Sequence, residues 1–362
     1  MTGDPGNELE VRSRVRDYAV EFADGTQWVA DLAALENAFV VVDENVHGLY
    51  RDGLLAPLQR AGVEVLPISE ERKTFASVQG LAETAVRRAA KRNCVVVSVG
   101  GGITQDVTGF LASTLYRGVR WVYAPTTLLA MADSCIGGKT SLNLGAHKNL
   151  LGTVYPPERV VVHTPFVATL AESDYASGMG EVVKLHLLGG ERDVRRLRAA
   201  LPALLRREHG AVTEVIRTSL GIKRDYIEDD EFDRGRRNLL NFGHCFGHAL
   251  ETVTGFAVPH GEAVVVGMLL ADEVAVGRGL LAPQAAAERR EQLYLPVLRA
   301  RPVLDAAARE AVVEAMSFDK KRTGEGLALV MVGDGLRARR VADLGRPEAL
   351  AALAALPALF GP

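Results

Sequence analysis

Short segments rich in β-branched residues alternate with amphipathic stretches along the first half of the chain. The segments lie at residues 37–43, 63–67, 94–99 and 118–124, and residues 77–92 between two of them repeat apolar positions at helical spacing. Runs of this kind are typical of parallel strands that are buried on both faces. The order of strand, helix and strand predicts βαβ units in a doubly wound, Rossmann-like α/β sheet.

The second half of the chain has a different pattern. Long amphipathic stretches dominate it, at residues 171–187, 195–206, 210–228 and 261–278. A periodicity near that of the α-helix, with little β-branched alternation, predicts a mostly α-helical half. Because 362 residues exceed the size at which a single core keeps growing, we expect an α/β domain at 1–170 and a helical domain at 171–362.

Composition and charge exclude several classes of protein. The net charge of -3 and the short arginine pairs, mixed with acids, give no electrostatic basis for binding nucleic acid. No apolar run approaches the ~20 residues that a membrane-spanning helix needs, and the N-terminus lacks the basic and apolar regions of a signal peptide. We therefore expect a soluble, cytoplasmic protein without a nucleic-acid or membrane partner.

A cluster of histidines marks the second half. His244, His248 and His260 lie within seventeen residues and are three of the eight histidines in the chain. Imidazole is the commonest metal ligand in proteins and titrates near neutral pH, so the cluster indicates a metal site or proton-transfer chemistry. The alternative is that helix-surface histidines lie together by chance. Spacing alone favours His244 and His248 as a metal-binding pair, because residues i and i+4 share a helix face.

Other residue types narrow the chemistry of this cluster. The three cysteines are far apart and form no CxxC pair, so any metal would be held by nitrogen and oxygen atoms. No glutamate follows His244 as in the HExxH motif, which disfavours a metalloprotease. Glu181 is a natural oxygen ligand for a zinc or cobalt site of two histidines and one carboxylate, which keeps open positions for substrate. Alternatively, Glu181 and Lys184 form an i,i+3 ion pair on a solvated helix.

A glycine-rich turn follows one of the predicted strands. Gly100, Gly101 and Gly102 stand between the strand at 94–99 and a predicted helix. Glycine lets the backbone approach a ligand closely, and a helix N-terminus offers N–H groups to an anion, usually a dinucleotide pyrophosphate. Such a turn alone can also serve only the geometry of the chain. An earlier strand ends in Asp43, where an acid can accept a hydrogen bond from a ribose hydroxyl, and the two features together favour a nucleotide.

Basic residues recur between the glycine-rich turn and the helical half. Arg117, Lys139 and Lys148 lie near glycines in an otherwise apolar region, and Asn149 follows the last of them. Lysine and arginine held near flexible backbone suit a phosphate group, and asparagine adds a neutral donor. Structural glycines and helix caps account for part of this pattern. The basic residues predict an anionic, sugar-like substrate beside the nucleotide.

The motifs, taken in order, resemble one family of enzymes. They are Gly100-Gly-Gly-(x3)-Asp106, Arg117-Gly, Pro125-Thr-Thr-Leu-Leu-Ala-Met-Ala-Asp133-Ser, Gly137-Gly-Lys139-Thr, Lys148-Asn149, Gly180-Glu181-Val-Val-Lys184, Arg237-(x3)-Asn241-(x2)-His244-(x3)-His248 and His260-Gly-Glu-Ala. From about Asp43 to Lys321 the chain is similar to the 3-dehydroquinate synthases, within the sugar phosphate cyclases. The resemblance implies a dehydroquinate synthase-like fold, with NAD+ in the N-terminal domain, a divalent metal in the C-terminal domain and an active site in the cleft between them.

The resemblance assigns roles by motif position. For NAD+ it implies contacts from Asp43, Glu70, Lys73, Gly101, Gly102, Asp106, Thr126, Thr127, Asp133, Lys139, Lys148 and Thr169. For the metal it implies Glu181, His244 and His260, in place of the pair that spacing favours. For catalysis it implies Asp133, Lys184, Lys223 and His248. For substrate binding it implies Arg117 of the partner subunit, Lys139, Asn149, Arg237, Asn241, His248 and, from the run Asp319-Lys320-Lys321, Lys320.

The resemblance also implies a reaction. NAD+ transiently oxidises 3-deoxy-arabino-heptulosonate 7-phosphate at C5, while zinc or cobalt polarises the neighbouring hydroxyls. Phosphate is then eliminated, the hydride returns, and an intramolecular aldol step closes the ring of 3-dehydroquinate. The implied enzyme is a phosphate-eliminating carbon–oxygen lyase of the shikimate pathway of aromatic amino acid biosynthesis, and it acts as a homodimer.

Three residues bear on the choice of substrate. Arg237 with Asn241 suits a carboxylate, whereas valiolone-type cyclases, which act on sedoheptulose 7-phosphate, typically carry proline in place of His248. The residues present therefore favour the acid substrate. Departures from the usual family pattern, such as residues 103–106, leave open a specialised cyclase of secondary metabolism, of the amino-dehydroquinate or valiolone type.

A metal-dependent polyol dehydrogenase is a further alternative. It would share the two-domain fold and the triple glycine turn and would use NAD+ in net turnover. It gives no reason, however, for the joint presence of Arg237, Asn241, Lys184 and Lys223.

Overall fold

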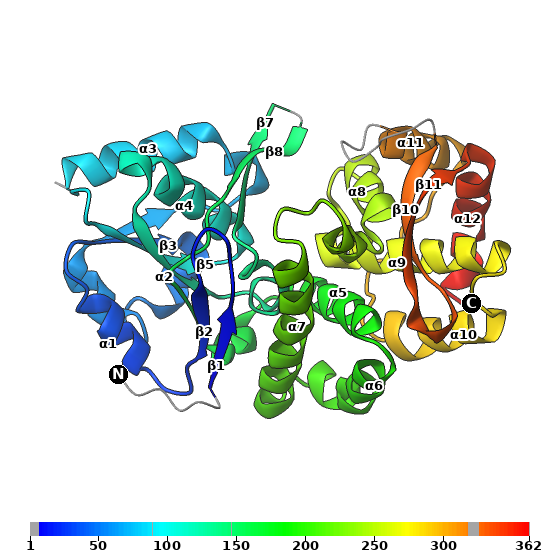
Figure 1. Cartoon of the computed structure of the whole chain (residues 1–362), viewed down its shortest axis with the longest axis horizontal. Coiled ribbons are helices and arrows are strands. Elements are labelled where there is room, and N and C mark those ends of the chain that lie inside the picture. Colours follow the sequence, from blue (N-terminus) through cyan, green and yellow to red (C-terminus); the bar gives the residue numbers. More distant parts are fainter. Residues whose placement is uncertain (1–6, 89, 146, 318–325, 362) are drawn as a thin grey trace. The chain divides into compact units, whose positions relative to one another are not determined.

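The computed structural model describes residues 7–88, 90–145, 147–317 and 326–361 of the chain (Figure 1). The chain divides into two compact units, Met1–Thr169 and Leu170–Pro362. In the described part, no helix is both long enough and apolar enough to span a membrane.

The first unit is built on a largely parallel sheet. Its strand order is β1-β2-β9-β6-β5-β3-β4, and the neighbouring strands are parallel except for β1 with β2. The strands span Glu8–Val11 (β1), Tyr18–Phe22 (β2), Ala38–Asp43 (β3), Val63–Leu66 (β4), Val95–Gly100 (β5), Arg120–Pro125 (β6) and Arg159–Val162 (β9). All of β5, and β3 from Phe39 onward, is buried, as expected of strands covered on both faces. The predicted doubly wound α/β fold is confirmed.

Helices and one hairpin complete the first unit. They are α1 (Gln27–Ala33), α2 (Glu44–Tyr50), α3 (Phe75–Arg87), α4 (Gly102–Thr114) and the antiparallel pair β7 (Lys139–Leu144) and β8 (His147–Val154). Asp43 ends β3 and caps α2, because its Oδ1 accepts the backbone N–H of Asn45 at 2.8 Å. Thr74 caps α3 in the same way through the N–H of Ser77. Such caps fix the point at which the chain leaves the sheet.

The second unit is mostly helical, as predicted. Its elements are α5 (Glu172–Gly189), α6 (Glu191–Leu205), α7 (His209–Asp229), α8 (His244–Val253), α9 (His260–Gly277), α10 (Pro283–Arg289), α11 (Ala306–Ser317), α12 (Arg346–Leu359), β10 (Leu327–Val332) and β11 (Ala338–Leu344). Every residue of α9 from Gly261 to Asp272 is buried, so this helix is covered all round. It packs against α5, α8, α12 and β10 (Figure 1). Short helical turns of both units lie at Ala56–Ala61, Glu70–Arg72, Leu115–Arg117, Ala130–Ser134, Thr164–Thr169, Arg236–Asn241, Arg290–Tyr294 and Asp334–Leu336.

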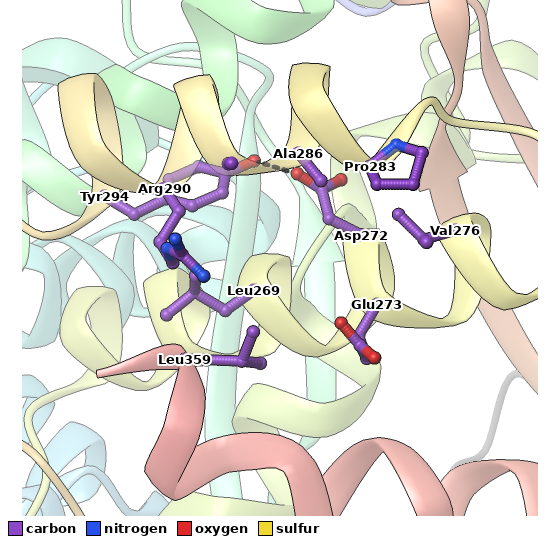
Figure 2. Close-up of a pocket in the computed structure, with 10 residues that line it drawn as sticks. Leu269, Asp272, Glu273, Val276, Pro283, Ala286, Arg290, Tyr294 and Leu359 are labelled. Atoms are coloured by element: carbon purple, nitrogen blue, oxygen red, sulfur yellow. Dashed lines mark hydrogen bonds between the residues drawn. The ribbon is translucent and has the colours of Figure 1, made fainter. Parts of the chain in front are cut away.

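A buried ionic network ties α9 to its neighbours. The Asp272 carboxylate lies 3.2 Å from the Arg289 guanidinium. It also accepts the Tyr294 hydroxyl at 2.9 Å (Figure 2). Arg289 also donates to the carbonyl oxygens of Val332 and Gly333, at 2.6 and 2.9 Å. Burial raises the pKa of Asp272 to about 6, although Arg289 and Tyr294 act in the opposite direction. Arg289 therefore supplies the hydrogen-bond donors for one buried carboxylate and two backbone carbonyl oxygens.

A small pocket of about 220 Å³ lies beside this network (Figure 2). Its walls are mostly apolar side chains from α9, α10 and the end of α12, such as Leu269, Val276 and Leu359. None of the residues to which the sequence assigns a function lines it. The pocket is accordingly no candidate for the active site.

Replacing Arg289 with methionine should lower the free energy of unfolding by about 3–5 kcal/mol, the usual cost of leaving one partner of a buried ion pair alone. Urea unfolding followed by circular dichroism measures the loss. Fluorescence of Trp28 and Trp121 reports separately on the first unit, because both tryptophans of the chain lie there. Arg290→Met is the control, since Arg290 pairs with the adjacent, exposed Glu291 and such a pair is worth less than about 1 kcal/mol. Equal losses in the two variants would contradict a special role for the buried network.

Candidate metal centre and nucleotide-binding edge

Glycines bring α5 and α9 into backbone contact. A Cβ atom on Gly261 would lie 1.7 Å from the carbonyl oxygen of Ser177, and one on Gly180 would lie 2.1 Å from the carbonyl oxygen of Gly261. The Gly261 N–H also donates to Ser177 Oγ at 2.9 Å. No larger residue fits this crossing without separating the helices. Glu181 and His260, each next to one of these glycines, are thereby brought together.

The crossing of α8 with α9 is built in the same way. Gly243 has a left-handed φ of 79°, and a Cβ atom there would lie 2.4 Å from the carbonyl oxygen of Val264. A Cβ atom on Gly267 would lie 1.9 Å from the carbonyl oxygen of Gly243. The close approach places His244, the first residue of α8, against the N-terminal half of α9.

Three ligand-type atoms converge between these helices. Glu181 Oε1 lies 3.5 Å from His244 Nε2 and 3.4 Å from His260 Nε2. Ligand atoms about 2.0–2.1 Å from a tetrahedral zinc ion are about 3.3–3.4 Å from one another. A nitrogen atom of His248 joins the cluster, since the ligand atoms of the three histidines all lie within 4.8 Å of one another. The donor set and its spacing fit a divalent cation that takes nitrogen and oxygen ligands.

A second acceptor orients each of the two nearest rings. His244 Nδ1 lies 3.1 Å from the carbonyl oxygen of Phe242, and His260 Nδ1 lies 3.0 Å from Glu251 Oε2. Both rings therefore turn Nε2 toward Glu181. Glu251 was not among the site residues predicted from the sequence. Helical spacing could have identified it, because Glu251 follows His244 by seven residues and the two side chains therefore lie on one face of a helix.

Burial and charge distinguish the groups of this cluster. The side chains of Glu181 and Lys184 are 2% and 4% exposed and form an ion pair, so the alternative of a solvated surface pair is wrong. Burial, followed by the nearby Lys184, lowers the pKa of His244 well below its ordinary value. Burial also acts to lower the pKa of His260, but hydrogen bonds to Glu181 and Glu251 outweigh it and raise this pKa to about 10. A cation that binds His260 Nε2 must displace a proton.

Other predicted residues of the second unit lie in the neighbouring elements. Lys223 is buried on α7, and His248 is exposed one turn after His244 on α8. Arg237 is 4% exposed and donates to the carbonyl oxygen of Glu231. Asn241 Nδ2 donates to the carbonyl oxygen of residue 238 at 2.8 Å. Lys320 lies outside the described residues.

The loop before Arg237 is held by one carboxylate. Asp230 accepts the backbone N–H groups of Arg234, Gly235 and Arg237 at 2.9, 2.7 and 3.1 Å. Desolvation opposes ionisation here, but these hydrogen bonds lower the pKa of Asp230 below its ordinary value. The ionised carboxylate fixes the backbone that presents Arg237.

In the first unit, three strand ends meet at the predicted nucleotide site. A Cβ atom on Gly100, at the end of β5, would lie 2.9 Å from the Cβ of Asp43 at the end of β3. A Cβ atom on Gly101 would lie 3.0 Å from Thr127 Cγ2, just after β6. The N–H of Thr126 donates to the Gly100 carbonyl oxygen at 3.0 Å. Ligands of open α/β sheets bind at this carboxyl edge.

Gly102 differs from the two glycines before it. A Cβ atom there would meet nothing closer than Ser134 Oγ at 3.7 Å, which is ordinary contact. Packing inside the protein therefore does not require glycine at this position. Gly102 begins α4, where the helix N-terminus presents N–H groups. A bare backbone at that point fits the close approach of a pyrophosphate.

A second set of predicted residues forms a network with the β7–β8 hairpin. Lys73 Nζ lies 2.5 Å from Asp106 Oδ2 and 2.6 Å from Asn149 Oδ1, and Ser141 Oγ lies within 2.9 Å of both acceptors. Asn143 Nδ2 donates to Glu70 Oε1 at 2.9 Å. The structure thus brings Asn149, predicted to contact the substrate, together with Lys73 and Asp106, predicted to contact NAD+.

The other predicted residues of the first unit come from several elements. Asp133 is buried in the short helix Ala130–Ser134, and Lys148 Nζ lies 3.9 Å from Glu70 Oε1. Thr169 Oγ1 lies 2.7 Å from the Tyr50 hydroxyl. Arg117, with a φ of 68°, and Lys139, at the start of β7, are exposed.

Comparison with known proteins decides the family. Residues 63–177 match the family profile described as 3-dehydroquinate synthase N-terminal, and residues 178–322 match that described as 3-dehydroquinate synthase C-terminal. The chain belongs to the 3-dehydroquinate synthase family. The 3-dehydroquinate synthase of Rhodospirillum rubrum is 38% identical over 331 residues, covering 86% of this chain and 85% of that protein. That of Roseobacter denitrificans is 40% identical over 260 residues, 70% of each chain. The resemblance predicted from the motifs is confirmed.

Solved structures carry the same family fold. A 2-epi-5-epi-valiolone synthase from Streptomyces hygroscopicus, with NAD+ and Zn²⁺ bound, is 27% identical, with a TM-score of 0.79 over 97% of this chain and 99% of that one. A 2-deoxy-scyllo-inosose synthase complexed with carbaglucose-6-phosphate, NAD+ and Co²⁺ has a TM-score of 0.81 over 96% of this chain and 99% of that one. It is 21% identical, so this second likeness concerns the fold alone.

Proposed function

We propose that this chain converts 3-deoxy-arabino-heptulosonate 7-phosphate to 3-dehydroquinate and phosphate, as a phosphate-eliminating carbon–oxygen lyase. The observation that carries the proposal is the convergence of Glu181 Oε1 on the Nε2 atoms of His244 and His260, at 3.5 and 3.4 Å. This donor set occurs in a chain whose relatives, at 35–40% identity, bear the name 3-dehydroquinate synthase.

The cofactors of the proposed reaction are NAD+ and one divalent ion, zinc or cobalt. Residues 1–170 bind the nucleotide, and residues 171–362 bind the metal through Glu181, His244 and His260. When bound, NAD+ reversibly accepts a hydride and the metal polarises substrate hydroxyl groups. The valiolone synthase structure, which contains NAD+ and Zn²⁺, supports this pair of cofactors.

Four side chains are proposed to act on protons and hydroxyl groups. Lys184 and Lys223 bring buried ammonium groups from α5 and α7, which donate hydrogen bonds to oxygens that gain negative charge. His248 is exposed, so its imidazole can exchange protons with the substrate phosphate and with water. Asp133 acts with them on the substrate hydroxyls.

The two anionic ends of the substrate need separate partners. Arg237 and Asn241 are proposed to bind the carboxylate, because a guanidinium with an amide beside it suits a planar anion. The hydrogen bonds of Asp230 preorganise the loop for this role. Basic and amide side chains are proposed to bind the phosphate: Lys139, Asn149, Lys320 and Arg117 of the partner subunit. The active form is then a homodimer.

A parallel assay of three substrates tests the proposal. With a catalytic amount of NAD+ and added Co²⁺, 3-deoxy-arabino-heptulosonate 7-phosphate should release phosphate in many turnovers, and absorbance of NADH should not accumulate, because the hydride returns within each turnover. Sedoheptulose 7-phosphate should be a poor substrate, since it lacks the carboxylate that Arg237 and Asn241 are proposed to bind. Turnover of sedoheptulose 7-phosphate alone would overturn the assignment of the substrate. NADH formed in stoichiometric amount from glycerol would instead indicate a polyol dehydrogenase.

A further inference from the structure

The carboxylate of Glu251 lies directly behind the candidate metal ligand His260. Its Oε2 is 3.0 Å from His260 Nδ1, on the side of the ring opposite Nε2. Glu251 is 7% exposed and lies on α8, seven residues after His244. One face of α8 therefore carries His244, His248 and Glu251 toward the start of α9.

The two candidate histidine ligands are held by acceptors of different kinds. His244 Nδ1 faces the neutral carbonyl oxygen of Phe242, whereas His260 Nδ1 faces a carboxylate. A carboxylate only accepts, so it keeps the hydrogen on Nδ1 and leaves Nε2 for a metal. A hydrogen bond to an ionised acceptor is also the stronger of the two. The two rings are therefore held by hydrogen bonds of unequal strength. The stronger one, at His260, comes from a side chain, which a substitution can remove.

We propose that Glu251 is a positioning residue that holds His260 in its metal-binding orientation and tautomer, and thereby sets the affinity of the centre for its divalent cation. Outer partners of metal ligands typically contribute 10–100-fold to metal affinity. The inference rests on the proposed metal centre and extends it by a residue that binds no metal itself.

The packing of the helices does not depend on this carboxylate. The α8–α9 crossing is made by backbone contacts at glycines, such as Gly247, where a Cβ atom would lie 3.0 Å from the Ala263 carbonyl oxygen. The backbone carbonyl of Glu251, which accepts the N–H of Phe256 at 2.8 Å, is retained in any variant. Removing the carboxylate is therefore expected to disturb His260 and to leave the fold intact.

Glu262 provides a matched control. It is also a buried glutamate and lies two residues from His260, but its Oε2 accepts the backbone N–H groups of Arg299 and Ala300 at 2.7 and 2.5 Å. These hydrogen bonds hold the backbone at Arg299 and Ala300 in place and do not orient a candidate metal ligand. The same change of glutamate to glutamine at the two positions therefore separates metal positioning from structural support.

The experiment compares Glu251→Gln, Glu251→Ala, Glu262→Gln and the unaltered protein after removal of metal by a chelator. Calorimetric titration with Co²⁺ and with Zn²⁺ should give dissociation constants about 10–100-fold higher for both Glu251 variants. The visible absorption of bound Co²⁺ should also change in them, because the ring geometry changes. The metal-free Glu251 variants should keep the far-UV circular dichroism spectrum of the unaltered protein, with only the small fall in urea midpoint that loss of the Glu251–His260 hydrogen bond causes. Glu262→Gln should keep the metal affinity and the Co²⁺ spectrum and lower the urea midpoint.

Unchanged metal affinity and an unchanged Co²⁺ spectrum in Glu251→Gln would overturn the inference. A fall in the urea midpoint of both Glu251 variants that is large enough to account for the weaker metal binding would overturn it as well. The titration uses no substrate, so its result is independent of the proposed reaction. If the Glu251 variants bind metal more weakly but the protein releases no phosphate from the sugar acid, the inference stands and the proposed function is wrong.

Discussion

Replacing Gly261 with alanine should remove tight metal binding and destabilise the second unit. The added Cβ would lie 1.7 Å from the Ser177 carbonyl oxygen, whereas Cβ atoms in proteins essentially never lie closer than 3.0 Å to such an atom, so α5 and α9 must move apart. Overpacking of this kind costs about 1–3 kcal/mol, and more where backbone opposes backbone. The movement separates Glu181 from His260, and a functional site tolerates displacements of only about 0.5 Å. Loss of a residue that only hydrogen-bonds to a metal ligand lowers metal affinity by up to about 100-fold. Because Gly261→Ala displaces a candidate ligand itself, we expect Co²⁺ affinity to fall by at least that factor.

Gly277→Ala is the control for this prediction. Gly277 ends the same helix, is exposed, and a Cβ atom there would have nothing within 4 Å. The substitution should leave Co²⁺ affinity unchanged and alter the free energy of unfolding by less than about 1 kcal/mol, in the direction of greater stability. Titration with Co²⁺ and urea unfolding measure both quantities. Unaltered metal affinity in Gly261→Ala would mean that the crossing does not determine the metal centre.

The strands of the sheet centre could be predicted because burial on both faces leaves a local pattern. The segments 37–43 and 94–99 agree within a residue with β3 and β5, since nearly every position there is buried. The strands β1, β2 and β9 were not predicted. Their pairing joins residues distant in the chain, Val20 with Val160 for example, and short strands carry little periodicity of their own. The β10–β11 hairpin was missed in a half whose pattern is dominated by helices.

The candidate metal centre shows where spacing stops being informative. Helical periodicity correctly places His244 and His248 on one face, but it cannot tell which other helix meets that face. His260 and Glu181 arrive there because glycines allow close crossings, and such crossings leave no periodic signal. The motif resemblance supplied those partners. Spacing could not distinguish a solvated from a buried Glu181–Lys184 pair either, since i,i+3 pairs occur in both settings.

Replacing Glu181 with glutamine should abolish tight metal binding and lower turnover of the sugar acid by at least about 1,000-fold. The shape of the side chain is nearly conserved, so the packing around α5 is retained. What changes is the anionic oxygen that lies 3.4–3.5 Å from two imidazole nitrogens. A bound metal ion acts as a Lewis acid and stabilises the transition state by several kcal/mol. Because about 1.4 kcal/mol corresponds to a factor of ten in rate, losing this stabilisation accounts for the expected fall in turnover. Titration with Co²⁺ and release of phosphate measure the two effects.

The same substitution leaves the buried Lys184 ammonium without its carboxylate, at a cost to stability of about 3–5 kcal/mol, and this cost must be separated from loss of a ligand. Lys184→Met and the double variant make the separation. If Glu181 binds the metal, Lys184→Met should retain metal affinity or raise it, because a positive charge leaves the site. The double variant should then recover stability, since neither charge remains buried alone, yet still bind no metal. Metal binding that survives Glu181→Gln, or that is lost equally in Lys184→Met, would reduce Glu181 to one half of a structural ion pair.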